Sequence, residues 1–400
     1  MVSLTLDLVA NVKAKENPKA LEAFSKKELA KVQAFHESMW GYYHPTKLVA
    51  LPHLAQYLGV KAIYVKDEAT RFGLKAFKAL GGSYAIASYL AHKFDREIIF
   101  DQLVALNLAE TAPNLTFATT TDGNHGRGVA WTARILGVKA VVYMPKGSTK
   151  ERVEAIRGEG AVVKVTESNY DDTVRQLAKE AEEKGWIVVQ DTAWENYEEI
   201  PLQIMQGYTT MVEEALKDLP EKPTHVFAQA GVGSLAAAVA AVMANTYGEN
   251  RPLFTILEAE AANCFYRSFQ AKKPVAVTGE MSTIMAGLAC GEVNPLAWDI
   301  LHSYSDYALS CHDEVAAVGM RLWGNPLPGD TAITAGESGA IGGGVLGLLD
   351  KYHDIKTTLG LNKDAVLLFF NTEGDTSPKH YRQVVWGGEL FCQLEDEGHV

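Results

Sequence analysis

Residues that would mark a metal centre are few and poorly spaced in this chain. Its four cysteines, Cys264, Cys290, Cys311 and Cys392, show no CxxC spacing, which argues against a structural zinc site. The histidines form neither an HxH nor an HExxH pattern, so a catalytic metal has no support. We expect all four cysteines to be thiols. A disulfide between Cys264 and Cys290, which both lie in loop-like sequence, is the alternative.

Long apolar runs and basic runs are also missing. No apolar stretch is long enough to span a bilayer, and a formal net charge of -12 argues against nucleic acid or an anionic membrane as a partner. The first residues, MVSLTLDLVANVKAKENPKAL, carry Asp7 inside their only apolar run and no basic residue ahead of it. We therefore expect neither a signal peptide nor a membrane anchor. We expect the protein to be located in the cytoplasm.

Strands and helices alternate regularly along much of the chain. Between residues 115 and 191 the apolar segments LTFATT, KAVVYMP, AVVKVT and WIVVQD are separated by helical stretches. A second series runs from THVFAQA through LFTILEAE to DAVLLFFNTEG, and KAIYVKDE at 61–68 predicts a further strand. This alternation predicts βαβ units and parallel sheets covered by helices on both faces.

A chain of 400 residues predicts two domains. We expect residues 1–88 and 195–400 to form a larger domain, into which residues 89–194 are inserted as a smaller α/β domain. The predicted fold class is α/β, with two lobes that each contain a mostly parallel sheet flanked by helices. Ligands in such sheets bind at the carboxyl ends of strands, where the polar motifs of this sequence fall.

Lys78 lies in the stretch GLKAFKALGG, between Phe77 and Ala79. A buried ammonium costs several kcal/mol unless it is paired or loses its proton. The pKa of lysine falls readily on burial, which makes Lys78 a candidate for Schiff-base chemistry. The alternative is a lysine at the start of a surface helix, with its stem buried and its amine in water.

A glycine-rich turn, AGVGSLAA, follows a predicted strand and opens a helix. Gly231 and Gly233 would let backbone amides approach an anion at the positive end of the helix, and Ser234 could add a hydroxyl. Gly231, Gly233 and Ala236, with Glu258 at the end of the next strand, also satisfy a dinucleotide-binding pattern. A tight turn that only packs the helix on the sheet is a third possibility.

The segment TTTDGNHGRG also follows a predicted strand. Its backbone N–H groups could hold a carboxylate, and Asn124 offers a donor to an oxyanion or phenolate. Asp122 would repel an anionic group, but it would suit a substrate that also carries an ammonium. The alternative is an Asx-type turn that caps the helix without any ligand.

Three further motifs carry acidic or hydroxyl side chains. Asp191 ends a strand in VVQDTAWE, Thr372, Glu373 and Asp375 lie in NTEGDT, and Glu337 lies in GESGAIGGG. Taken alone, Asp191 is better explained as a solvated carboxylate in a turn, and Glu337 is at least as consistent with a helix cap as with contact to a ligand.

The order of these motifs resembles that of the fold-type II pyridoxal-phosphate enzymes, relatives of tryptophan synthase β and of threonine and serine dehydratases. The resemblance covers nearly the whole chain. The chain departs from many of those relatives, with AFKALGG where they have SFKxRG and TTDGNHGRG where they have SxGNH. There, and in VVQDTAWE, MAGLACGE and NTEGDT, it is similar to one branch, the diaminopropionate ammonia-lyases.

This resemblance implies pyridoxal phosphate as the cofactor, attached to Lys78 as a Schiff base. Asn124 would face the cofactor's 3′ oxygen, and Thr372 would be the partner of the pyridine nitrogen, although nearby Asp375 leaves that assignment open. The phosphate would be held by the glycine-rich turn, which comprises Gly231, Val232, Gly233, Ser234 and Leu235.

The reaction implied by the resemblance is the elimination of ammonia from both enantiomers of 2,3-diaminopropionate, which gives pyruvate and two ammonia molecules. Lys78, Asp122 and Asp191 would be catalytic, and Thr120 and Thr121 would join the two aspartates in binding the substrate. A base on each face of Cα would explain the use of both enantiomers, but the sequence leaves open which aspartate serves which face. The relatives also imply a homodimer that acts on a small-molecule amino acid.

Three alternatives remain at this point. A dehydratase or lyase of the same fold that acts on serine, threonine or another β-substituted amino acid would not need Asp122. An NAD-dependent oxidoreductase would rest on the glycine pattern alone and leave Lys78 without a task. A non-catalytic protein would bind pyridoxal phosphate without releasing ammonia.

Overall fold

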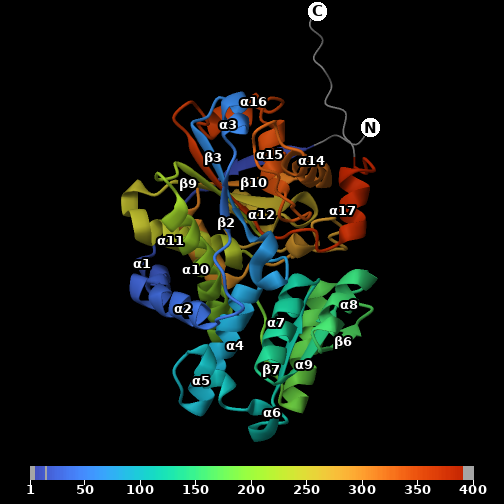
Figure 1. Ribbon diagram of the computed structural model, residues 1–400. Coiled ribbons are helices and arrows are strands. Elements are labelled where there is room, and N and C mark those ends of the chain that lie inside the picture. The colour runs from blue at the N-terminus through green and yellow to red at the C-terminus, as the bar shows by residue number, and fades with distance from the viewer. Residues whose placement is uncertain (1–4, 14–15, 391–400) are drawn as a thin grey trace, which may run out of the picture.

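The computed structural model describes residues 5–13 and 16–390, which form two β-sheets with helices packed around them. In Figure 1 the larger sheet lies in the upper part of the molecule, and the smaller one lies below it among helices α7, α8 and α9. The predicted α/β architecture with mostly parallel sheets is confirmed. Within the two described ranges, no helix is both long enough and apolar enough to cross a membrane.

The larger sheet has seven strands in the order β1-β10-β9-β8-β11-β3-β2. Its central strands run parallel, whereas β1 and β2 pair antiparallel at the two edges. The apolar strands β8 and β11 are buried along their whole length, as expected of parallel strands covered on both faces. The strands are β1 (Leu6–Ala10), β2 (Lys47–Ala50), β3 (Ala62–Asp67), β8 (His225–Gln229), β9 (Leu253–Ala259), β10 (Tyr307–Cys311) and β11 (Val366–Asn371).

The smaller sheet has four parallel strands in the order β6-β5-β4-β7. The last of them is shorter than the segment WIVVQD predicts, because Gln190 leaves the ladder and its side chain bonds to Thr120 instead. The strands are β4 (Thr116–Thr120), β5 (Lys139–Met144), β6 (Val162–Val165) and β7 (Ile187–Val188), and the helices that pack on them are α7 (Asn124–Ile135), α8 (Lys150–Gly158) and α9 (Tyr170–Lys184). Two short helices, α5 (Phe100–Val104) and α6 (Leu108–Thr111), precede β4 in the chain.

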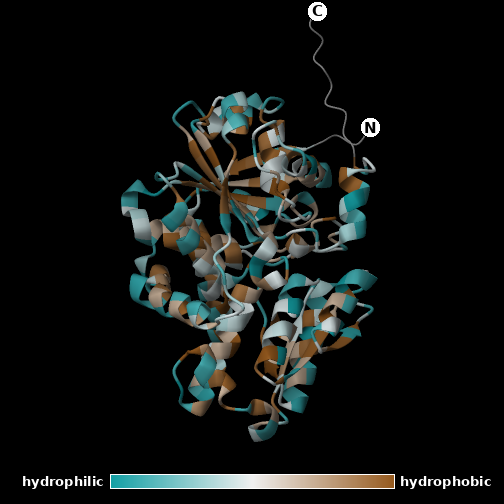
Figure 2. Ribbon diagram, in the orientation of Figure 1, coloured by the Kyte–Doolittle hydropathy of each residue, from teal (hydrophilic) through white to brown (hydrophobic). Residues whose placement is uncertain are grey.

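The remaining helices pack mainly around the larger sheet. Figure 2 shows hydrophobic residues concentrated on its strands and hydrophilic residues on the outer helices. These helices are α1 (Pro18–Leu21), α2 (Lys26–Ser38), α3 (Pro52–Leu58), α4 (Ala79–Phe94), α10 (Glu199–Asp218), α11 (Ser234–Tyr247), α12 (Cys264–Ala271), α13 (Pro295–Tyr304), α14 (Asp313–Gly324), α15 (Ile341–Leu348), α16 (His353–Thr358) and α17 (Pro378–Val385); short 3-10 turns are η1 (Glu22–Phe24), η2 (Glu68–Gly73), η3 (Gly248–Asn250), η4 (Glu260–Ala262) and η5 (Ala286–Leu288).

Helix α4 connects the two sheets. It begins directly after Lys78 and packs against α10 on one side and against α7 of the smaller sheet on the other. The domain boundary that we predict near residue 88 falls inside this continuous helix. The division into 1–88 with 195–400 and 89–194 therefore stays a prediction.

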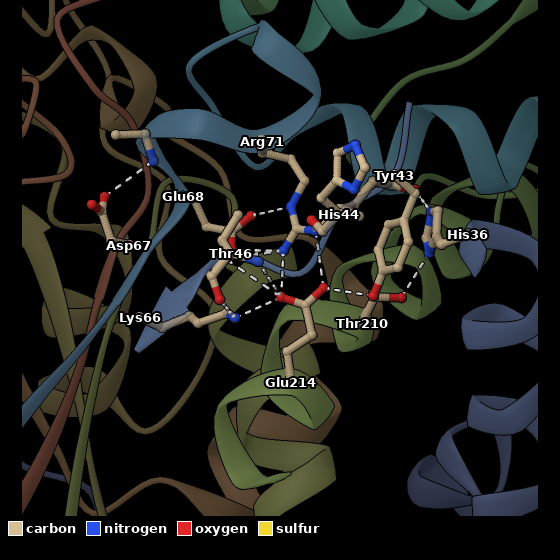
Figure 3. Close-up of polar contacts among 12 residues, drawn as sticks. His36, Tyr43, His44, Thr46, Lys66, Asp67, Glu68, Arg71, Thr210 and Glu214 are labelled. Atoms are coloured by element: carbon tan, nitrogen blue, oxygen red, sulfur yellow. Dashed lines mark hydrogen bonds and ion pairs between the residues drawn. The ribbon is translucent and has the colours of Figure 1, made fainter. Parts of the chain in front are cut away.

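A buried charge cluster, made of Lys66, Glu68, Arg71 and Glu214, ties the segment before the lysine loop to helix α10 (Figure 3). Arg71 donates to Glu68 Oε2 at 2.8 Å and to Glu214 Oε2 at 2.7 Å, and Lys66 Nζ lies 2.5 Å from the same Glu214 oxygen. Two cations thus balance two carboxylates. Thr46 adds hydrogen bonds to Glu68 and Glu214.

His36 lies beside this cluster and is fully buried (Figure 3). Its Nδ1 accepts a hydrogen bond from Thr210, and its Nε2 donates to the Leu80 carbonyl. Burial, and then the positive charge of Arg71, lower the pKa of His36 to about 3. In the unfolded chain this imidazole takes up a proton with a pKa near 6.5, whereas in the native protein it stays neutral at that pH. Stability supplied by this site is therefore present above pH 6.5 and is lost as the pH falls.

We expect His36→Gln to flatten the acid side of the stability profile. Each pH unit below the unfolded pKa costs the wild type about 1.4 kcal/mol through this site. The loss of unfolding free energy between pH 7.5 and pH 5.0 should thus be about 2 kcal/mol smaller in the variant. Urea unfolding at the two pH values measures it, with exposed His92→Gln on α4 as the control. An equal loss in wild type and variant would show that His36 does not contribute.

Candidate active site

A cavity opens at the carboxyl ends of strands β8 and β11. This is the edge at which the sequence predicts a ligand. Its walls come from segments that are far apart in the chain: Phe77, Lys78, Asn124, Asp191, Tyr208, Gln229, Gly231, Val232, Gly233, Ser234, Leu235, Gly287, Leu288, Cys290, Ser338, Thr372 and Glu373.

Lys78 and Asp191 form an ion pair inside this cavity. The Lys78 Nζ lies 2.5 Å from Asp191 Oδ2, and the lysine side chain is 17% exposed. Burial alone would lower the pKa of Lys78, but the Asp191 carboxylate outweighs it and raises that pKa. Burial alone would raise the pKa of Asp191, and the Lys78 ammonium lowers it. The Lys78 ammonium is thus held inside the cavity by the Asp191 carboxylate, and Lys78 is not on the surface.

Asn124 and Glu373 meet on another wall of the cavity. Asn124 is the first residue of α7, and its side-chain amide donates to Glu373 Oε2. Glu373 follows β11, and its second oxygen accepts from the Ser338 backbone N–H at 3.1 Å. Burial, and then the nearby Glu337 carboxylate, raise the pKa of Glu373. Thr372, next to Glu373, is also buried and lines the cavity.

The glycine-rich turn presents the N-terminus of α11 to the cavity. Gly233 has φ +95°, and a Cβ there would lie 2.3 Å from a ring carbon of Phe265, so no other residue fits. No side chain caps α11, and its first turn contains no acidic residue. Its first backbone N–H groups therefore point at an anion site. The sequence suggests that the Ser234 hydroxyl could bind the anion, but in the structure it donates to the Asp191 carbonyl at 2.7 Å.

These groups fit pyridoxal phosphate. Lys78 supplies an amine for the aldehyde, and the uncapped α11 turn supplies N–H groups for the phosphate. Asn124 and Thr372 supply an amide and a hydroxyl to the walls between them. The hydroxyls of Ser338 and Tyr208 are buried without a hydrogen-bond partner in the described part of the chain, as polar groups that await a ligand would be.

Glu258 argues against a dinucleotide site. One of its carboxylate oxygens accepts from the Phe265 N–H at 2.8 Å and the other from the Tyr266 N–H at 2.7 Å. Burial raises its pKa to about 8. The carboxylate caps helix α12 and has no free oxygen for a ribose, so the GxGxxA pattern does not mark an NAD site here.

Asp122 does not line the Lys78 cavity. It lines an adjoining cavity, which Cys290 also borders. Neither Thr120 nor Thr121 lines either cavity: Thr120 bonds to Gln190 and Thr173, and the Thr121 hydroxyl accepts from the Gly123 N–H. Their proposed part in substrate binding stays a prediction.

Several residues of the site were not predicted from the sequence. The Tyr170 hydroxyl lies 3.4 Å from Asp191 Oδ1 and accepts from Gln190 Nε2 at 2.7 Å. Tyr208, in the middle of α10, gave no sequence signal at all. Ser338 could have been found, because it stands in GESGAIGGG beside Glu337. The structure has Cys264, Cys290 and Cys311 as free thiols, and Cys392 lies outside the described residues.

Comparison with known proteins agrees with this geometry. Residues 39–354 match the family of pyridoxal-phosphate dependent enzymes. The chain is 51% identical to diaminopropionate ammonia-lyase of Escherichia coli K12, over 92% of this chain and 93% of the relative. It is 48% identical to that of Salmonella typhimurium LT2, over 89% and 91%.

The fold is also similar to that of a solved structure. The crystal structure of the Escherichia coli diaminopropionate ammonia lyase, in complex with an aminoacrylate-PLP azomethine reaction intermediate, has a TM-score of 0.89 and 47% identity, and the match covers 97% of this chain and 98% of that one. The chain therefore belongs to the diaminopropionate ammonia-lyases, a branch of the pyridoxal-phosphate dependent enzymes.

Proposed function

We propose that this protein eliminates ammonia from 2,3-diaminopropionate and so yields pyruvate and two ammonia molecules. The observation that carries the choice of substrate is the 51% identity with a diaminopropionate ammonia-lyase along 92% of the chain. The reaction removes the Cα proton and the Cβ amino group, which leaves a double bond between the two carbons. The released aminoacrylate reacts with water to give pyruvate and the second ammonia.

The cofactor and the side chains of the site have different roles in this reaction. Bound pyridoxal phosphate supplies an electron sink that acidifies the Cα proton of the amino acid. We assign Lys78 as the attachment point and as a proton carrier, and Asp191 as the carboxylate that pairs with its ammonium. The backbone of residues 231–235 would bind the phosphate, while Asn124 and Thr372 would orient the ring.

Asp122 and Asp191 provide two carboxylates in adjoining cavities. Either can accept a proton from Cα or hold the second ammonium of the substrate. A base on each side supports turnover of both enantiomers. The buried thiols of Cys264, Cys290 and Cys311 suit a reducing compartment, so we place the enzyme in the cytoplasm. We infer from the family resemblance that it is a homodimer.

The ratio of products distinguishes this substrate from serine or threonine. Purified enzyme loaded with cofactor is given each enantiomer of 2,3-diaminopropionate, and separately serine and threonine, while ammonia and the keto acid are assayed together. We expect two ammonia molecules for each pyruvate from 2,3-diaminopropionate and much slower turnover of the hydroxyl amino acids. Faster release of one ammonia for each keto acid from serine or threonine would favour the dehydratase alternative.

A further inference from the structure

The two candidate carboxylates have different basic partners. Asp191 is paired with Lys78, whereas Asp122 faces Arg152, with 3.9 Å between Asp122 Oδ2 and Arg152 Nη1. Among the described residues, Arg152 is the only basic side chain in ion-pair contact with Asp122. Cys290 borders both cavities, so the two ion pairs lie in neighbouring parts of one region.

Arg152 is packed into the fold and is mostly buried. It lies in the first turn of α8 and its stem passes over Gly123, where a Cβ would be 3.2 Å from Arg152 Cδ. The side chain is only 14% exposed. Its guanidinium makes no hydrogen bond to another residue in the part of the chain described, so its donors are directed at Asp122 and at the space beside it.

Arg152 also lies among several negative charges. Burial lowers its pKa, but Asp122, then Glu337 and Glu373, raise it. Arg152 is thus a cation close to three carboxyl groups, of which Asp122 has the largest effect on it. A base that takes a proton from carbon must be correctly aimed at that proton, and the ion pair with Arg152 fixes the direction of the Asp122 carboxylate.

We propose that Arg152 is a positioning residue for Asp122, and that it determines how well the enzyme uses the one enantiomer whose Cα proton faces Asp122. In that reaction the Cα proton passes to an Asp122 oxygen, and the electrons of the C–H bond enter the new carbon–carbon double bond. The protonated Cβ amino group leaves as neutral ammonia and takes the electrons of the Cβ–N bond with it. The other enantiomer relies on Asp191, which has Lys78 as its own partner. This kinetic role rests on the proposed function.

Kinetics with separate enantiomers test this role. Arg152→Gln should lower kcat/KM by about tenfold or more for the enantiomer that Asp122→Asn also impairs, and by less than about twofold for the other. Arg152→Lys should recover much of the loss, because it restores a positive charge. Arg157→Gln, an exposed arginine on the same helix, should change neither enantiomer. An equal loss on both enantiomers would overturn the proposal.

A second measurement needs no turnover and no cofactor. In an Asp122→Cys variant, the introduced thiol reports the local charge through the pH dependence of its alkylation, followed by mass spectrometry of the peptide that contains position 122. Adding Arg152→Gln should raise the pKa of that thiol by about 1 unit. An unchanged pKa would refute the pairing of Arg152 with position 122. If wild type turned over neither enantiomer, the proposed function would fail, and this titration would still decide the pairing.

Discussion

Replacing Lys78 by alanine is expected to lower pyruvate formation by at least about a thousandfold, because the site loses both its covalent attachment point and its proton carrier. In the described residues, Lys78 is the only lysine that lines the cavity. Its replacement also leaves Asp191 buried without its cation. Burial then dominates and the pKa of that carboxylate rises, so Asp191 would lose its ability to accept a proton near neutral pH.

A lysine on the same loop provides the matched control. Lys75 pairs with Asp375 at 2.7 Å and its side chain is 44% exposed, so Lys75→Ala should keep nearly full activity. Borohydride reduction of wild type loaded with cofactor should add the cofactor mass to the peptide that contains Lys78, and the same treatment of Lys78→Ala should add none. Modification of another lysine in wild type would contradict the assignment.

The part of the site that was predictable from sequence consists of residues that directly follow strands. Asn124, Asp191 and Thr372 each come a few residues after an apolar segment, and the carboxyl ends of parallel strands meet at one edge. Gly231 to Leu235 carry the additional signal of a glycine-rich turn that opens a helix. Local pattern and sheet topology together were enough to bring these residues into one cavity.

The rest of the site depends on packing between distant elements. Tyr208 enters from the centre of α10, and Arg152 from a helix of the smaller sheet, and neither stands in a motif. The sequence also places Asp122 beside Asn124, but it does not show that the Asp122 side chain lines the adjoining cavity and not the one that contains Lys78. Side-chain direction at the start of a helix is decided by neighbours that are remote in sequence.

The buried charge cluster was equally invisible in the sequence. The segment KAIYVKDE at 61–68 predicts a strand, but nothing in the sequence shows that the charged residues at its end are buried. In the structure Lys66, Glu68 and Arg71 are at most 1% exposed. Their burial is possible only because Glu214, more than a hundred residues away on α10, completes the charge balance.

Removing that one carboxylate should therefore be costly. Glu214 accepts from Arg71 through both oxygens, pairs with Lys66 and accepts from the Tyr43 hydroxyl at 2.8 Å. Burial alone would raise its pKa, but Arg71 and then Lys66 lower it to about 2. Glu214→Gln leaves two buried cations with a single carboxylate, and we expect it to lower the unfolding free energy by about 3–5 kcal/mol. The stabilisation that the ionised Glu214 supplies is complete above its pKa in the unfolded chain, 4.5, and is lost as the pH falls toward its pKa in the native protein, about 2.

A double-mutant cycle separates the charge balance from a general packing defect. Lys66→Met removes one of the two cations, so in combination with Glu214→Gln it leaves a neutral Arg71–Glu68 pair. The double variant should then be more stable, by about 1 kcal/mol or more, than the sum of the two single losses predicts. Denaturant unfolding at pH 7 measures all three variants, with exposed Glu199→Gln at the start of α10 as a control that should stay within about 0.5 kcal/mol of wild type. If the two losses of unfolding free energy simply add, the charges do not interact and only packing holds the cluster together. A double variant more stable than that sum would show that the opposite charges hold the segment before Lys78 against α10.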